Sequence, residues 1–289
     1  MASPQVRKFN RFFVCGIDGT VDHFAGIAGN LKANERDYDT KFAKSFVRQL
    51  CSSGMEGRYL RGPAATGSGL GWAMSEALSV ISLRFNQDAT AFYRSKSDLH
   101  DPHRRGYILT GYSRGAAGII EVATRIATGL AYKSLGIQIY AMILFDCVNE
   151  TDTSAQGFIN RGGIPTYSNR ESIITGSLQI PSNVANCVHY IRSDDTNSRS
   201  DTMAKYRGGP INTARTRYTP LYLKATHGGL GGLPYFQGTG EGNNIPILEP
   251  GAAFATNVTM AEDILASRQI AKHATTFCCS LGVPLALSV

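Results

Sequence analysis

Short apolar runs alternate with longer segments of helical periodicity along most of the chain. This alternation predicts an α/β fold with a mostly parallel central sheet flanked by helices on both faces. The predicted strands are residues 12–17, 58–61, 106–110, 138–145, 187–192 and 219–225. Residues 140–145 are apolar at nearly every position, which is the pattern of a central parallel strand buried on both faces.

Four helices are predicted between and after these strands, at residues 40–52, 71–86, 114–135 and from 260 onward. Each places apolar side chains at helical spacing on one face. Gly136 is positioned to end the third helix. The last helix is marked at its start by a capping box, Thr259-Met-Ala-Glu262, and at its end by Gly282 and Pro284.

No Pro- or Ser-rich linker divides the chain, so residues 1–289 are predicted to form a single domain. Residues 149–182 are polar, rich in Gly and Thr, and weakly periodic. Segments of this length without periodicity are often functional. A lid over the site and a plain surface insertion are equal alternatives for this segment.

Composition excludes several classes of protein. Hydrophobic residues make up 43% and charged residues 18% of the 289 positions, which excludes a disordered chain. No apolar run approaches the ~20 residues of a transmembrane segment. The apolar run at 12–17 is too short for a signal peptide, and the six cysteines show no C-x-x-C spacing. We therefore expect a cytoplasmic protein with reduced thiols in the cell that makes it.

The chain has 29 Lys and Arg against 22 Asp and Glu, a formal charge of +7. Such an excess is compatible with peripheral contact with an anionic membrane surface. Basic residues are not interleaved with aromatic ones in a nucleic-acid motif, so no nucleic-acid partner is expected. The pair His100 and His103 flanks Pro102, which prevents a shared helix face, and no metal site is predicted.

The strongest chemical signal is Gly111-Tyr-Ser113-Arg114-Gly115, which follows a predicted strand and opens an Ala-rich helical segment. A G-x-S-x-G sequence in this context predicts a nucleophile elbow with Ser113 as the nucleophile. The serine would then project beside the amides of a helix N-terminus, and the Arg114 N–H would be one oxyanion donor.

Asp18-Gly19-Thr20 directly follows the first predicted strand. An amide near Gly19 is the second candidate oxyanion donor, with Asp18 or Thr20 orienting the loop. A simple Asp-Gly turn is the equal alternative.

Three histidines follow Ser113 in the chain, and they differ in setting. His227 lies in a Gly-rich loop just after a predicted strand, where a general base could reach the serine. His189 lies inside a predicted strand and is expected to pack in the core. His273 lies in the last helix and is expected to face solvent or a helical neighbour.

Two positions are candidates for the acid that orients the base. Asp146 ends the most apolar strand, whereas Asp194 and Asp195 end a later one. A carboxylate at the end of a buried strand is unfavourable unless it is paired, which favours Asp146. A triad of this kind needs no cofactor.

These segments together resemble a known family, the α/β-hydrolase domains of the type VI secretion phospholipase effectors. Its D-G-T motif after the first strand is matched by Asp18-Gly-Thr20, and its G-F-S-R-G-A elbow by Gly111–Ala116. Its D-T-V strand end is matched by Asp146-Cys-Val148, and its H-S-D-V-G-G motif by His227–Gly232. The likeness extends over nearly the whole chain.

The resemblance implies an α/β-hydrolase fold, with Ser113, Asp146 and His227 as nucleophile, acid and base. It also implies a lipid or phospholipid ester as substrate, delivery by a specialised secretion system, and an immunity protein as partner. Two other functions stay open at this point. One is hydrolysis of small soluble esters, and the other is a non-catalytic basic binding module.

Overall fold

The structure is a computed structural model that describes residues 9, 11–20, 38–53, 55–63, 70–148, 178–198, 209–235, 244–249 and 254–289. Its six strands form one sheet in the order β2-β1-β3-β4-β5-β6, and every neighbouring pair is parallel. The strands are β1 (Arg11–Ile17), β2 (Glu56–Leu60), β3 (Arg105–Tyr112), β4 (Ile139–Phe145), β5 (Val184–Arg192) and β6 (Arg217–Leu223). All six predicted strands are confirmed, with shifted ends.

Burial along the strands follows their place in the sheet. Every residue of β3 is buried, and in β4 only Tyr140 is partly exposed. The edge strands differ, because the first three residues of β2 are exposed and β6 has no fully buried residue. Central parallel strands are covered on both faces and therefore read as continuous apolar runs.

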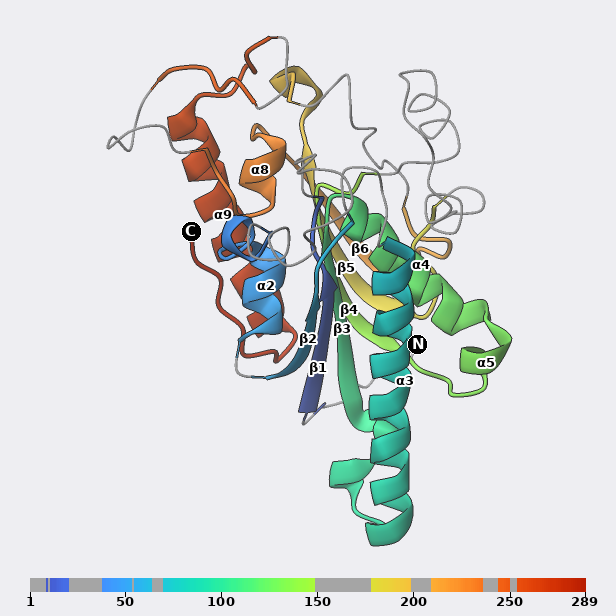
Figure 1. Cartoon of the computed structure of the whole chain (residues 1–289). Helices are drawn as coiled ribbons and strands as arrows, with labels where there is room; N and C mark the ends of the chain where they lie inside the picture. The colour runs from blue at the N-terminus through green and yellow to red at the C-terminus, as the bar shows by residue number, and fades with distance from the viewer. Residues whose placement is uncertain are drawn as a thin grey trace, which may run out of the picture.

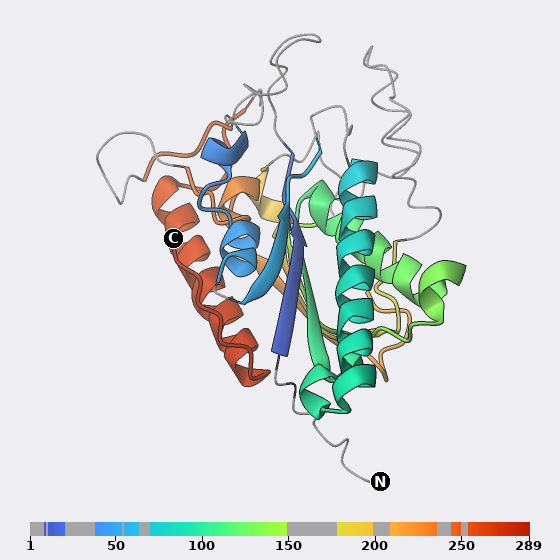
Figure 2. The same cartoon turned by 60° about the horizontal axis from the view of Figure 1, so that its bottom comes forward.

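Helices cover both faces of the sheet (Figures 1 and 2). One layer consists of α3 (Leu70–Ser95), α4 (Arg114–Thr128) and α5 (Leu130–Lys133), which enclose one hydrophobic core with the sheet. The other consists of α2 (Phe46–Cys51) and α9 (Met260–Ser280), over a second core. This arrangement, with the strand order above, is the predicted α/β-hydrolase fold.

Short elements complete the connections. A four-residue helix, α8 (His227–Leu230), lies at the carboxyl edge of the sheet beside α9. Three 3₁₀ turns are η1 (Asp98–His100), η2 (Pro102–Arg104) and η3 (Asp194–Thr196). The predicted lid or insertion at 149–182 falls, except for its last residues, outside the described residues.

Two of the predicted helices differ from the structure. The helix predicted at 114–135 is interrupted at Gly129, which has extended backbone angles (φ −67°, ψ 131°) and separates α4 from α5. The helix predicted at 40–52 is also divided, because Ser45 begins a new helix by accepting a hydrogen bond from Arg48 N at 3.1 Å. Ser is a strong N-cap, so it starts α2 inside a segment that is helical by periodicity.

The other two helices agree with their signals. α3 begins near the predicted position and continues nine residues past Asn86. The capping box of α9 is present, with Thr259 N donating to Glu262 Oε2 at 2.9 Å and Glu262 N donating to Thr259 Oγ1 at 3.3 Å. Gly282 adopts the left-handed conformation (φ 74°) that ends the helix.

Because all six strands are parallel, their carboxyl ends lie along one edge of the sheet. Ser113 follows β3, Asp146 follows β4, and His227 follows β6 after a short loop. In open α/β sheets this edge is where ligands bind. The topology therefore brings three residues that are far apart in sequence to the same end of the molecule.

Candidate active site

Ser113 occupies a sharp turn between β3 and α4, with left-handed backbone angles (φ 58°, ψ −131°). This conformation is strained for any residue other than glycine and is the geometry of a nucleophile elbow. The turn is possible because Gly115 has no side chain. A Cβ there would lie 2.2 Å from Asp18 O, so the glycine lets the start of α4 pack directly against the end of β1.

A second left-handed residue, Asp146 (φ 41°), ends β4. Two hydrogen bonds join its turn to the elbow. Ser113 N donates to Phe145 O at 3.0 Å, and Val148 N donates to Ser113 O at 3.1 Å. The turn that carries the serine and the turn that carries the carboxylate are therefore bonded to each other through the backbone.

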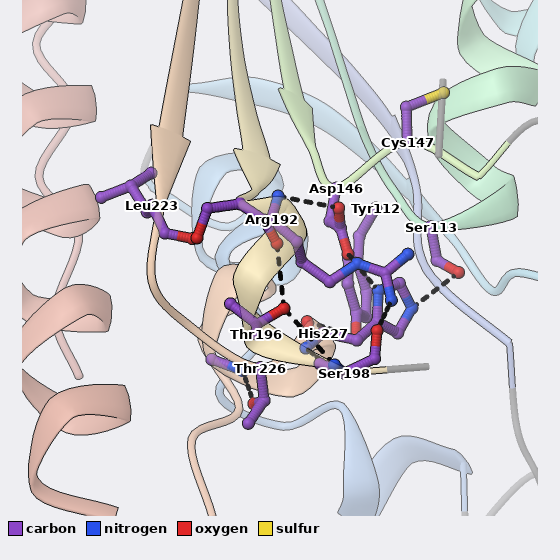
Figure 3. A network of polar contacts seen from close by, with 12 residues as sticks. Tyr112, Ser113, Asp146, Cys147, Arg192, Thr196, Ser198, Leu223, Thr226 and His227 are labelled. Carbon is purple, nitrogen blue, oxygen red and sulfur yellow. Dashed lines mark hydrogen bonds and ion pairs between the residues drawn. The ribbon is translucent and has the colours of Figure 1, made fainter. Parts of the chain in front are cut away.

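The side chains of Ser113, His227 and Asp146 form a continuous hydrogen-bonded chain (Figure 3). His227 Nε2 lies 3.0 Å from Ser113 Oγ, and His227 Nδ1 lies 2.5 Å from Asp146 Oδ2. All three residues are buried. This is the order of contacts in which an imidazole accepts a serine proton while a carboxylate holds its other nitrogen.

The surroundings of Asp146 and His227 favour a charged carboxylate beside a neutral imidazole. Burial alone would raise the pKa of Asp146, but the Arg192 guanidinium and the hydrogen bond to His227 outweigh it and hold that pKa below its ordinary value. Burial lowers the pKa of His227, against the opposing influence of Asp146. Near neutral pH the site thus contains an ionised carboxylate and a neutral imidazole.

The loop that carries the base is held by contacts to its backbone. His227 N donates to Ser198 Oγ at 2.9 Å, and Tyr112 Oη donates to His227 O, also at 2.9 Å. The rings of Tyr112 and His227 pack with their centroids 4.8 Å apart. The imidazole is thereby fixed from two sides before any substrate is present.

Asp263 of α9 also holds the loop that carries His227. Its carboxylate accepts Thr226 N at 2.7 Å and Thr226 Oγ1 at 2.9 Å. The loop approaches so closely that a Cβ on Gly229 would lie 2.1 Å from Asp263 Oδ1. Gly229 therefore leaves the space that this buried carboxylate occupies.

The turn at Asp18–Thr20 lies next to the elbow, as its proximity to Gly115 shows. Arg114 Nε donates to Thr20 Oγ1 at 2.8 Å, which ties this turn to the first residue of α4. Gly19 N donates to Asp18 Oδ1 at 2.9 Å. The amide of Gly19 therefore donates within its own turn. The neighbouring amide, that of Thr20, is the next candidate for the second oxyanion donor.

Asp18 is completely buried at the end of β1. Besides Gly19 N, its carboxylate accepts hydrogen bonds from Tyr59 Oη at 3.0 Å and from Ser45 Oγ. Burial raises the pKa of Asp18 to about 7, against the lowering effect of these donors. These hydrogen bonds tie Asp18 to its own turn, to β2 and to Ser45, and its role in orienting an oxyanion donor stays a prediction.

The remaining candidates lie apart from the serine. Asp194 and Asp195 are in η3 with exposed side chains, whereas Asp146 contacts the imidazole directly. His189 is buried in β5, with Nδ1 3.2 Å from Tyr218 Oη, which confirms that it packs in the core. His273 is exposed on α9, as predicted, and its Nδ1 also contacts Tyr190 of strand β5, which was not predicted.

Among the described residues, no group of three or more His, Cys, Asp or Glu side chains is arranged to hold a metal ion. Within the same ranges, no helix has the length and apolar character required to cross a bilayer.

Several residues of the site were not identified from the sequence. Among them are Arg192, Ser198, Glu249 and Asp263. One of them had a readable signal. Arg192 is a charged residue at the end of the predicted strand next to Asp146, and a buried cation there requires an anionic partner. The contacts of the other three depend on loops whose paths no periodicity describes.

The whole chain can be set beside known proteins. No family model matches it, and no curated protein matches it. Solved structures do match. The Tle1 effector bound to the VgrG spike of the type 6 secretion system is 15% identical, with a TM-score of 0.37, over 78% of this chain and 51% of that one.

Two further structures are similar in shape. An uncharacterized protein from Pseudomonas aeruginosa is 14% identical, with a TM-score of 0.45, over 96% of this chain and 47% of that one. Esterase 2 of Thermogutta terrifontis is 14% identical, with a TM-score of 0.40, over 99% of this chain and 89% of that one. The chain spans about half the length of the first two structures. At these levels of similarity, the assignment of the fold depends on the strand order described above.

Proposed function

We propose that this chain is a serine hydrolase that cleaves carboxylic esters through Ser113, His227 and Asp146. The observation that carries the proposal is the buried chain of contacts from Ser113 Oγ to His227 Nε2 at 3.0 Å and from His227 Nδ1 to Asp146 Oδ2 at 2.5 Å. The serine in this chain has left-handed backbone angles at the start of a 15-residue helix. A plain strand-to-helix turn requires neither the strain nor the two partners.

The reaction follows from these positions. Ser113 Oγ attacks the ester carbonyl carbon while His227 Nε2 takes the serine proton. The tetrahedral intermediate collapses, the C–O bond to the alcohol breaks, and the imidazolium returns the proton to the leaving alcohol. Water then attacks the acyl-enzyme by the same steps, which releases the carboxylic acid and restores Ser113. Asp146 holds the imidazole in the required tautomer and stabilises its charged form.

The negative charge on the carbonyl oxygen needs donors at the same end of the sheet. Arg114 is the first residue of α4, and N–H groups in the first turn of a helix have no intrahelical acceptor. We assign its N–H as one oxyanion donor and the Thr20 N–H as the other. The side-chain bond between Arg114 and Thr20 holds these two backbone segments together.

For the substrate we propose a lipid or phospholipid acyl ester. Two features support this: the motif resemblance to the phospholipase effector family, and the formal charge of +7, which favours contact with an anionic membrane surface. Delivery by a secretion system and an immunity protein as partner stay predictions of that resemblance.

Labelling with a fluorophosphonate tests the reaction without knowledge of the substrate. Ser113 Oγ attacks phosphorus, fluoride leaves, and His227 takes the proton, so that only an activated serine reacts. We expect the folded protein to be labelled and Ser113→Ala to be unlabelled. Absence of labelling in the folded protein, both alone and with lipid micelles, would contradict the proposal and favour a basic binding module.

A panel of esters tests the substrate class. Turnover should be compared for p-nitrophenyl acetate, p-nitrophenyl octanoate, and vesicles of phosphatidylglycerol or phosphatidylcholine. We expect the highest rate on the anionic vesicles, with a decrease at high salt because screening weakens surface attraction. A preference for the acetate ester would instead indicate an esterase for small soluble substrates. Ser113→Ala is the control for spontaneous hydrolysis.

A further inference from the structure

Arg192 is the last residue of β5 and is completely buried. We infer that Arg192 is a positioning residue of the active site, one that holds the Asp146 carboxylate toward His227 and links it to the loop at 193–198 that supports the base. The inference rests on the proposed function, because it assigns a role in the activation of Ser113. It concerns a residue that touches neither the serine nor the imidazole in the contacts described above.

Arg192 contacts the proposed acid, Asp146, directly. Arg192 Nε lies 2.5 Å from Asp146 Oδ2, and Arg192 N donates to Asp146 Oδ1 at 3.3 Å. One residue therefore touches both carboxylate oxygens, through its side chain and its backbone (Figure 3). Rotation of the carboxylate away from His227 Nδ1 would break an ion pair whose side chains are 0% and 1% exposed, and breaking a buried pair is unfavourable.

The Arg192 guanidinium also makes a contact on its opposite side. Arg192 Nη1 donates to Ser198 O. The side chain of the same serine accepts His227 N at 2.9 Å and donates to Glu249 Oε1 at 3.0 Å. Arg192 thus lies between the acid and the residue that holds the backbone of the base. A change in its position would be transmitted to both.

Arg192 also acts on Asp146 and His227 through its positive charge. Among the residues that the structure describes, the charged and titratable groups that face the acid–base pair are Arg192 and His189 of β5, Glu249, Cys147 and Tyr112. Arg192 is the cation among the groups that act on both members of the pair, and it lowers the pKa of Asp146 and of His227 alike. Its removal should therefore raise both values.

The chain offers a matched control at the other end of the sheet. Arg105 is also buried, and its Nε lies 2.5 Å from Asp88 Oδ2, the same type of contact as that of Arg192 with Asp146. Arg105→Met removes the buried cation that contacts Asp88 and leaves the residues of the candidate active site unchanged. Any effect shared by the two variants reports lost stability, and any effect peculiar to Arg192 reports positioning.

The experiment measures the rate constant of fluorophosphonate labelling between pH 5 and pH 9. It compares four proteins: the wild type, Arg192→Met, Arg192→Lys and Arg105→Met. Rates are expressed per folded molecule, with the folded fraction taken from circular dichroism. For Arg192→Met we expect a maximal rate about 10- to 100-fold lower, the size of effect produced by a misplaced catalytic group. We also expect the acid limb of its profile to lie at higher pH than that of the wild type.

The other variants separate charge from shape. Arg192→Lys keeps the positive charge but lacks the planar fork, so we expect a lower maximal rate with the acid limb close to its wild-type position. Arg105→Met should lower the midpoint of urea unfolding and leave both the rate and the profile unchanged. Should Arg192→Met fail to fold, Arg192→Lys alone tests the inference, because a purely structural role predicts a wild-type rate in every molecule that folds.

The outcomes are distinct from those of the proposed function. If the wild type is labelled neither alone nor with lipid micelles, the proposed function fails. If the wild type is labelled, and Arg192→Met and Arg192→Lys keep its maximal rate and acid limb per folded molecule, the inference fails while the function stands. A lowered rate with an unmoved acid limb in Arg192→Met would also overturn it, since the electrostatic part would then be absent.

Discussion

Each end of the sheet buries an arginine in contact with an aspartate, but the two pairs lie in different structural settings. At the amino edge, Arg105 opens β3 and contacts Asp88 of α3, which also accepts Arg11 Nη1 at 2.9 Å. At the carboxyl edge, Arg192 contacts Asp146, which also contacts His227. Asp88 contacts two arginines, whose charge is permanent, whereas Asp146 contacts one arginine and His227, which can titrate.

The backbone differs in the same way. Arg105 has ordinary extended angles (φ −89°, ψ 127°). At the carboxyl edge, both Asp146 and Ser113 are left-handed. A buried ion pair is weak support for stability, and backbone strain opposes it. The amino-edge pair thus lies in ordinary backbone, whereas the carboxyl-edge pair lies in strained backbone, as expected if it serves the proposed reaction.

Replacement of the acid should have the largest effect. We expect Asp146→Asn to lower kcat about 10,000-fold, because the asparagine favours the wrong imidazole tautomer. Asp194→Asn, a matched change in an exposed residue, should stay within about twofold of the wild type. Ester hydrolysis by purified, folded proteins measures both. A severe loss in Asp194→Asn with a mild one in Asp146→Asn would move the acid to η3.

Replacement of the amino-edge aspartate should act on stability alone. Asp88→Asn leaves Arg105 buried with a weaker set of partners, and we expect the free energy of unfolding to fall by about 3 kcal/mol. Urea denaturation gives this value, and hydrolysis per folded molecule should be unchanged. A lower kcat in Asp88→Asn would show that the two edges are coupled, contrary to the comparison.

The pH dependence should report the titratable member of the carboxyl-edge cluster. Because burial lowers the pKa of His227, the neutral form that accepts the serine proton persists below pH 6.5. We expect kcat/KM to stay level through pH 6.5 and to fall about tenfold per unit only below the lowered pKa of His227. A profile that has already dropped to half of its plateau at pH 6.5 would contradict the lowered pKa.

The smallest effect is expected at the start of α9. Thr259→Ala removes the capping box, which should cost about 1 kcal/mol of stability. Thr259 caps the helix that carries Asp263 but makes none of the site contacts described above, so turnover should be unchanged. Thermal unfolding monitored by circular dichroism, paired with an ester assay, checks both. A drop in turnover would indicate that the position of Asp263 depends on this cap.

The predictable part of the molecule is the part with local signals. The six strands were recognised from apolar runs, and the elbow from a serine between glycines at a strand-to-helix junction. Two helices are predicted as continuous because the apolar periodicity runs through Ser45 and Gly129. In the structure, Ser45 caps the start of α2 and Gly129 ends α4. Local pattern fails where one residue's conformation overrides its neighbours.

The site was only partly predictable, for a related reason. Residues that follow parallel strands must meet at one edge, so Ser113, Asp146 and His227 could be grouped from topology alone. Ser198, Glu249 and Asp263 reach the site through loops and a helix terminus with no fixed relation to the strand order. Their contacts are long-range in sequence and could be seen only in three dimensions.

The hydrogen bonds between the elbow and the turn after β4 divide the proposed catalytic residues into two units. Ser113 and Asp146, the proposed nucleophile and acid, lie on one unit, since Ser113 is bonded by its own backbone to Phe145 and Val148. His227, the proposed base, lies on a separate loop that is held by contacts to Ser198 and Tyr112 and, through Thr226, to Asp263. Evolution or engineering can therefore reshape the base-bearing loop and its entrance while the serine–carboxylate half stays in register.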